Sequence, residues 1–117
     1  MNFMVPPAKG VNYRRIAVVT GSRAEYGLLS GVARKILSAS DLKLQLIVTG
    51  MHLDPRFGET WREIEADGFP IAAMVKMSQA DDSRLNVARA TGVGCVGMAD
   101  TLDRLKPDLM LILGDRF

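Results

Sequence analysis

The chain has 117 residues, the size of one domain or of part of one. Its 15 basic and 13 acidic residues give a net charge of +2, which does not indicate binding of nucleic acid through a basic surface. Hydrophobic residues make up 48% and charged residues 24%, which excludes a chain that is disordered throughout. The single cysteine, Cys95, excludes an internal disulfide and favours the cytoplasm. The longest aliphatic run, residues 109–113, is far shorter than the ~20 residues of a membrane helix, so we expect no membrane association.

The chain opens with a predicted flexible leader over residues 1–13, which contains prolines and a glycine but no long apolar stretch typical of a signal peptide. Residues 14–117 then predict a partial Rossmann-like domain. A β-branched run over 15–21 predicts a buried strand. Residues 24–37 predict a helix with one apolar face. That face is expected to carry Leu28, Val32 and Ile36, with Leu29, Ala33 and Leu37 beside them.

The middle of the chain predicts a strand, a short helix and another strand. Residues 42–49 alternate between apolar and polar side chains at first and then become apolar, as in a buried strand. Thr60 and Glu63 have the spacing of a capping box, which predicts a helix that begins at Thr60. Gly68 suits the C-terminal cap of that helix. Residues 71–77 predict the third strand.

The last elements are a long helix over residues 84–105 and a fourth strand over 109–113. Asp81 and Asp82 are expected to cap this helix rather than bind a metal. Its glycines lower helix propensity but would let the helix approach the sheet closely. The residues expected to face the core are Leu85, Ala88, Gly92, Cys95, Ala99 and Leu102.

Strands and helices alternate throughout, which predicts an α/β fold with a doubly wound parallel sheet and right-handed crossovers. The expected strand order is 3-2-1-4, numbered along the chain. Because the chain stops just after a central strand, we expect it to be truncated.

In such a sheet, ligands bind beyond the carboxyl ends of the strands, at the point where the strand order reverses. Here that point brings together the loop after the first strand and the segment after the fourth. The first loop offers backbone N–H groups, a helix N-terminus and Arg23, which suit a phosphate or diphosphate. The alternative is that Gly21 only makes the turn and Ser22 only caps the helix. The candidate nucleotide-binding residues are Ser22, Arg23, Glu25, Tyr26 and Gly27.

Three further residues at this edge are candidates for catalysis. Asp115 is a candidate acid or base and Arg116 a candidate substrate clamp, although the two could instead form a structural ion pair. His52 follows the second strand and is a candidate for a proton relay. A single histidine without further ligands at a suitable spacing does not indicate a metal site, so we expect none.

Two common cofactor-binding motifs are absent. The turn after the first strand lacks the Gly-x-Gly-x-x-Gly pattern, and the second strand ends in Thr49-Gly50 without an acidic residue, which disfavours a nicotinamide site. No strand is followed by the Gly-Lys-Ser/Thr of a P-loop. We therefore expect no cofactor.

In several separated motifs the sequence resembles the hydrolysing UDP-N-acetylglucosamine 2-epimerases, which make N-acetylmannosamine for bacterial sialic acid synthesis. The motifs are residues 19–27, 48–53, 57–58 and 106–117. The resemblance implies a two-domain glycosyltransferase-B type fold, of which this chain covers the first part of the amino-terminal domain. It implies elimination of UDP from the sugar nucleotide followed by hydration of the resulting glycal.

For individual residues, the resemblance implies that Arg23 contacts the nucleotide phosphates. It implies that Asp115 takes part in acid–base chemistry and that Arg116 lies near the substrate. The implied partners are UDP-N-acetylglucosamine or a related nucleotide sugar and further copies of the chain. Further catalytic groups would lie downstream of Phe117, so this chain alone is expected to be inactive. The alternatives are a non-catalytic nucleotide- or partner-binding module and the non-hydrolysing branch of the family, which Ala24 disfavours because those enzymes carry proline there.

Overall fold

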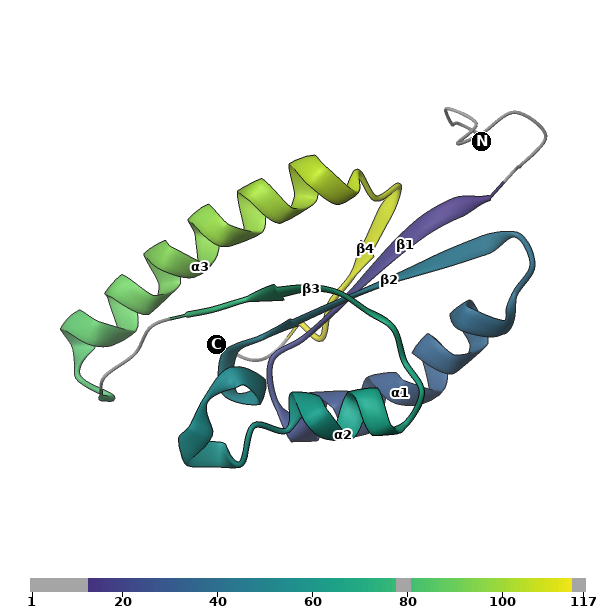
Figure 1. The fold of residues 1–117 in the computed structure, drawn as a ribbon. Helices are drawn as coiled ribbons and strands as arrows, with labels where there is room; N and C mark the ends of the chain where they lie inside the picture. The colour runs from purple at the N-terminus through teal and green to yellow at the C-terminus, as the bar shows by residue number, and fades with distance from the viewer. Residues whose placement is uncertain (1–12, 78–80, 115–117) are drawn as a thin grey trace.

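The computed structural model describes residues 13–77 and 81–114, so the predicted leader, apart from Tyr13, and the candidates Asp115 and Arg116 lie outside the described residues. Four parallel strands form one sheet in the order β3-β2-β1-β4, which confirms the predicted fold class and strand order. In Figure 1 the sheet lies between α3 on one face and α1 and α2 on the other. The strands are β1 (Arg14–Thr20), β2 (Leu42–Thr49), β3 (Ile71–Val75) and β4 (Leu109–Leu111). The helices are α1 (Arg23–Ser38), α2 (Trp61–Ala66) and α3 (Arg84–Leu105), with two 3-10 turns, η1 (Gly50–Leu53) and η2 (Pro55–Phe57).

The two faces of the sheet bury separate apolar clusters, because successive side chains of a strand point to opposite faces. The larger cluster lies under α1 and α2 and includes Val18, Leu46 and Ile64. The smaller lies under α3 and is built on Ala17 and Ile47. The central strands β1 and β2 are therefore covered on both sides, which explains their nearly continuous apolar sequence.

Helix α1 is anchored by a variant of the capping box, in which the glutamate bonds the residue before the N-cap. Ser22 is the N-cap, and its hydroxyl accepts a hydrogen bond from the N–H of Glu25. The Glu25 carboxylate accepts the N–H of Gly21 at 2.8 Å. The predicted apolar face is only partly right: the buried residues are Leu29, Ala33 and Ile36. Leu28 and Val32 are exposed by 69% and 46%.

Helix α2 begins directly after Thr60, the predicted N-cap, but the predicted capping bond is absent. Thr60 has helical backbone angles, and its hydroxyl is turned toward His52 rather than toward the N–H groups of the helix. The helix end is as predicted, since Gly68 follows α2 with a φ of 88°. The two 3-10 turns between β2 and α2 are absent from the sequence prediction.

Helix α3 presents a different face from the predicted one. Of the expected core residues only Leu102 packs against the sheet, and Cys95 is exposed. Ala90 and Thr101 are buried instead. The expected close approach does occur at two glycines: an added Cβ would lie 2.8 Å from Val75 at Gly97 and 3.1 Å from Met77 at Gly94.

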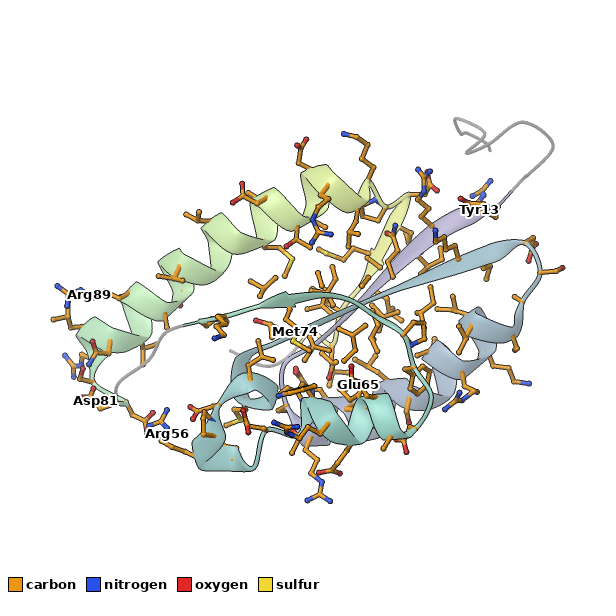
Figure 2. The ribbon with its side chains drawn as sticks, viewed as in Figure 1. Tyr13, Arg56, Glu65, Met74, Asp81 and Arg89 are labelled. Atoms are coloured by element: carbon orange, nitrogen blue, oxygen red, sulfur yellow. The ribbon has the colours of Figure 1, made fainter. Side chains whose placement is uncertain are left out.

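The start of α3 is organised by Ser83 and Asp81. Ser83 is the N-cap. Hydrogen bonds from Ser83 and Asn86 lower the pKa of the Asp81 carboxyl to about 2. Figure 2 shows Asp81 and Arg56 of η2 at the same end of the molecule, and the positive charge of Arg56 also favours the carboxylate. Across residues 13–77 and 81–114, the helices are all too short or too polar to cross a bilayer.

Candidate functional site

The loops after β1 and β2 are joined at the carboxyl edge of the sheet. The N–H of Met51 donates to the carbonyl oxygen of Gly21 at 2.8 Å. Gly50 has a φ of 62°, and a Cβ on it would lie 2.9 Å from that same oxygen. Only glycine allows both this backbone conformation and this close contact. The start of α1 and the turn η1 are therefore held in one fixed arrangement.

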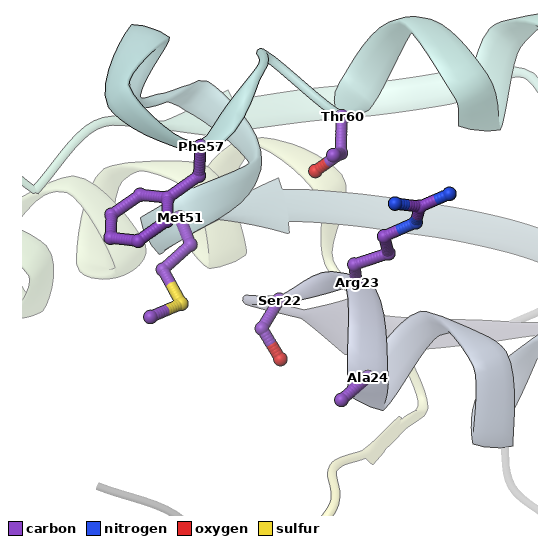
Figure 3. Close-up of a pocket in the computed structure, with 6 residues that line it drawn as sticks. All are labelled: Ser22, Arg23, Ala24, Met51, Phe57 and Thr60. Carbon is purple, nitrogen blue, oxygen red and sulfur yellow. The ribbon is translucent and has the colours of Figure 1, made fainter.

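A pocket of about 280 Å³ opens beside this junction (Figure 3). Its wall is polar at the start of α1 and largely apolar at the two 3-10 turns. Figure 3 shows Met51 and Phe57 on one side of the pocket and Arg23 on the other. Met51 and Phe57 are exposed by 43% and 48% although they are apolar, so a ligand could cover them. The residues that line the pocket are Ser22, Arg23, Ala24, Met51, Phe57 and Thr60.

Two of the predicted nucleotide-binding residues, Ser22 and Arg23, line this pocket. The Arg23 guanidinium lies 3.3 Å from a carboxylate oxygen of Glu63 on α2. Both side chains are well exposed, so this ion pair is weak and an anionic ligand can compete for the arginine. Glu25 does not line the pocket; its carboxylate already takes the N–H of Gly21 that a phosphate could use.

Tyr26 and Gly27 are not brought to the pocket. The Tyr26 hydroxyl donates to Asp67, and its ring packs edge-on against Phe69 in the larger apolar cluster. Burial and the neighbouring carboxylate of Asp67 raise the pKa of Tyr26. Gly27 lies on α1 with open space where a Cβ would be placed.

His52 is completely buried below the pocket. Its Nε2 lies 2.9 Å from the hydroxyl of Thr20 and its Nδ1 lies 2.7 Å from the hydroxyl of Thr60. Burial lowers the pKa of His52, against the opposing charges of Glu25 and Glu63. The imidazole therefore stays neutral at pH 7 and has no surface available to a ligand.

Asp115 and Arg116 follow the described end of the chain at Gly114. Because β4 runs parallel to β1, its carboxyl end lies at the same edge as the pocket. In the described part of the chain, no three His, Cys, Asp or Glu side chains gather closely enough to hold a metal ion.

The apolar part of the pocket was not predicted. Met51 and Phe57 belong to 3-10 turns, which have no hydrophobic periodicity to reveal them. The available signals were local: Pro55 at the start of η2 and Gly58 after it, with a φ of 82°, mark a tight turn that holds Phe57 outward.

A parallel sheet with helices on both faces and a pocket at its carboxyl edge defines a Rossmann-like domain. The profile of the UDP-N-acetylglucosamine 2-epimerase family matches residues 34–117, and the chain belongs to this family.

Three relatives illustrate the range of the family. The chain is 39% identical over 88% of its length to the UDP-N,N'-diacetylbacillosamine 2-epimerase (hydrolyzing) of Legionella pneumophila. It is 38% identical over 89% of its length to the GDP/UDP-N,N'-diacetylbacillosamine 2-epimerase (hydrolyzing) of Campylobacter jejuni. It is 29% identical over 88% of its length to the UDP-N-acetylglucosamine 2-epimerase of Neisseria meningitidis. The chain spans about 27% of the length of the first two relatives and 26% of the third.

The fold is also that of a solved structure. The crystal structure of the UDP-GlcNAc 2-epimerase from Neisseria meningitidis bound to UDP-GlcNAc superimposes with a TM-score of 0.67. The match covers 87% of this chain and 26% of that chain, at 16% sequence identity. This agreement confirms the Rossmann-like fold.

Proposed function

We propose that the whole protein containing this chain is a hydrolysing 2-epimerase of a UDP-linked 2-acetamido sugar. The proposal depends mainly on the pocket of this chain, which belongs to the 2-epimerase family. The pocket holds Arg23 beside a helix N-terminus at the carboxyl edge of the sheet. This chain would supply one wall of the site in a two-domain glycosyltransferase-B type enzyme. A cytoplasmic location and assembly with further copies of the chain belong to the same proposal.

In the proposed reaction, a base removes the proton on C2 of the sugar and the C–H electron pair forms the C1–C2 double bond. The bond from C1 to the UDP oxygen breaks, and UDP leaves with the electron pair of that C–O bond. Water then adds its hydroxyl to C1 and a proton is delivered to C2 from the opposite face. Arg23 would bind the diphosphate, Asp115 would serve in proton transfer, and Arg116 would hold the substrate.

UDP-N-acetylglucosamine is one candidate substrate, and UDP-N,N'-diacetylbacillosamine is the second. Two observations favour the second. The relatives named for it are 39% and 38% identical, against 29% for the UDP-N-acetylglucosamine enzyme. The apolar wall of Met51 and Phe57 also suits a sugar that carries a second acetamido group and a methyl group in place of hydroxyls.

The test is to incubate the whole protein with each sugar nucleotide in deuterium oxide and to analyse the products. A hydrolysing epimerase releases UDP and a free sugar inverted at C2 with deuterium at that carbon. A non-hydrolysing enzyme gives a UDP-linked epimer instead. A binding module gives no product from either substrate, which would contradict the proposal.

Replacing Arg23 with Ala is expected to weaken UDP binding by about tenfold to a hundredfold, the size of a lost charge-assisted hydrogen bond. Isothermal titration of the whole protein with UDP measures this change. Arg62→Ala is the matched control, because Arg62 forms a similar exposed ion pair with Glu59 but does not line the pocket. An equal loss of affinity in both variants would show that Arg23 has no specific role.

A further inference from the structure

Three buried hydroxyl and imidazole groups form a row beneath the pocket. Thr20, His52 and Thr60 are exposed by only 1%, 0% and 8%. The imidazole lies between the two hydroxyls and uses both of its nitrogens. Buried hydrogen bonds of this kind are costly to lose, because the group left behind has no water to replace its partner.

This row connects two of the segments that line the pocket, the start of α1 and the start of α2. Thr20 is the last residue of β1 and stands two positions before Ser22. Thr60 is the residue before α2 and lines the pocket itself. His52 comes from η1, which is a separate segment. The imidazole thus ties the start of α1 to the start of α2.

The direction of the hydrogen bonds can be assigned from the partners. The Thr20 hydroxyl donates to the carbonyl oxygen of Ser22 at 3.4 Å, so its oxygen is left to accept from His52. The proton of the neutral imidazole is therefore on Nε2, and Nδ1 accepts from the hydroxyl of Thr60. The row is a continuous donor chain from Thr60 to the N-cap of α1.

Burial keeps the imidazole in this neutral form. The Tyr26 ring packs nearly perpendicular to the imidazole, at an interplanar angle of 87° with 6.3 Å between centroids. Glu25 and Glu63 are the charged groups that act on His52, and both favour the protonated ring. Burial outweighs them and keeps the ring uncharged.

We propose that His52 is a positioning residue, whose bonds to Thr20 and Thr60 hold the start of α1 and the start of α2 at the spacing that binds a nucleoside diphosphate. The ring does not touch the ligand; it acts through Ser22 and Arg23 on one side and Thr60 on the other. The nature of the ligand rests on the proposed function, whereas the positioning itself does not.

The first test compares Thr20→Val with Thr20→Ser in the whole protein. Valine keeps the shape and removes the hydroxyl, whereas serine keeps the hydroxyl. Thr20 does not line the pocket, so any effect on the pocket must pass through its hydrogen bonds. Hydrogen exchange measured by mass spectrometry is expected to speed up over residues 20–26 in Thr20→Val and to stay near wild type in Thr20→Ser.

A second variant, His52→Gln, separates the two bonds. The Gln amide nitrogen can replace Nε2 and keep the bond to Thr20, but it leaves Thr60 without a partner. Exchange is then expected to rise over residues 58–64 and not over 20–26. This variant keeps the inference testable if Thr20→Val does not fold.

Titration with UDP supplies a readout that a merely structural role would not change. Folded Thr20→Val is expected to bind UDP about tenfold more weakly, and Thr20→Ser within about twofold of wild type. Wild-type affinity in Thr20→Val, or unchanged exchange over residues 20–26, would overturn the positioning role. If the wild-type protein binds no UDP but the exchange changes appear, the proposed function fails and the positioning role stands.

Discussion

Replacing Asp115 with Asn in the whole protein is expected to slow UDP release by roughly 10²–10⁴-fold, the usual loss for a removed acid–base group. The amide is similar in shape to the carboxylate but cannot take up or deliver the C2 proton. UDP affinity should change little, because the diphosphate is assigned to Arg23. The carboxyl end of β4 lies at the pocket edge, so the position suits this role.

The matched control for this prediction is Asp108→Asn, at the opposite end of β4. The Asp108 carboxylate accepts the N–H of Arg15 at 2.8 Å, far from the pocket edge, and its loss should affect only stability. Turnover of both variants is followed by UDP release and their folding by circular dichroism. Wild-type turnover in Asp115→Asn would remove this residue from the mechanism.

Replacing Gly50 with Ala is expected to lower the free energy of unfolding by roughly 3 kcal/mol. Part of this loss comes from the positive φ of 62° at Gly50. An L-residue in this left-handed conformation is destabilised by about 1–2 kcal/mol. The rest arises because the new Cβ would lie 2.9 Å from the carbonyl oxygen of Gly21. The loops must move apart, which weakens the hydrogen bond from Met51 to that oxygen.

Gly58→Ala is the control that separates the two causes, the positive φ and the close contact with the Gly21 oxygen. Gly58 has a φ of 82° but open space where a Cβ would be placed, so its replacement should cost only about 1–2 kcal/mol. Urea denaturation followed by circular dichroism compares the two variants with wild type. Equal losses of stability would mean that the Gly21–Gly50 contact contributes nothing.

Sequence reasoning succeeded where a local pattern decides the structure. The apolar runs predicted all four strands, and the alternation of strands with helices left the strand order 3-2-1-4 as the simplest topology. That order alone predicted that the first loop, with Ser22 and Arg23, lies at the carboxyl edge where strand order reverses. The structure puts both residues in the wall of the pocket.

Only the tertiary structure decided the buried face of α3. Alanine, glycine and valine are spread around this helix, so its periodicity does not single out one side. What selects the face is close approach: Gly94 and Gly97 allow the backbone onto Met77 and Val75, and Cys95 is turned to solvent.

The two candidate capping boxes near the pocket also show what local sequence predicts and what tertiary packing decides. Ser22–Glu25 and Thr60–Glu63 have the same spacing and the same chemistry, so the sequence cannot rank them. Ser22 has no competing partner and caps its helix. Thr60 lies within hydrogen-bond distance of a buried imidazole, and its hydroxyl is turned toward that ring rather than toward the start of α2. The sequence by itself determined the sheet and which loops lie at its carboxyl edge, whereas tertiary packing decided the partners of the polar side chains beneath the pocket.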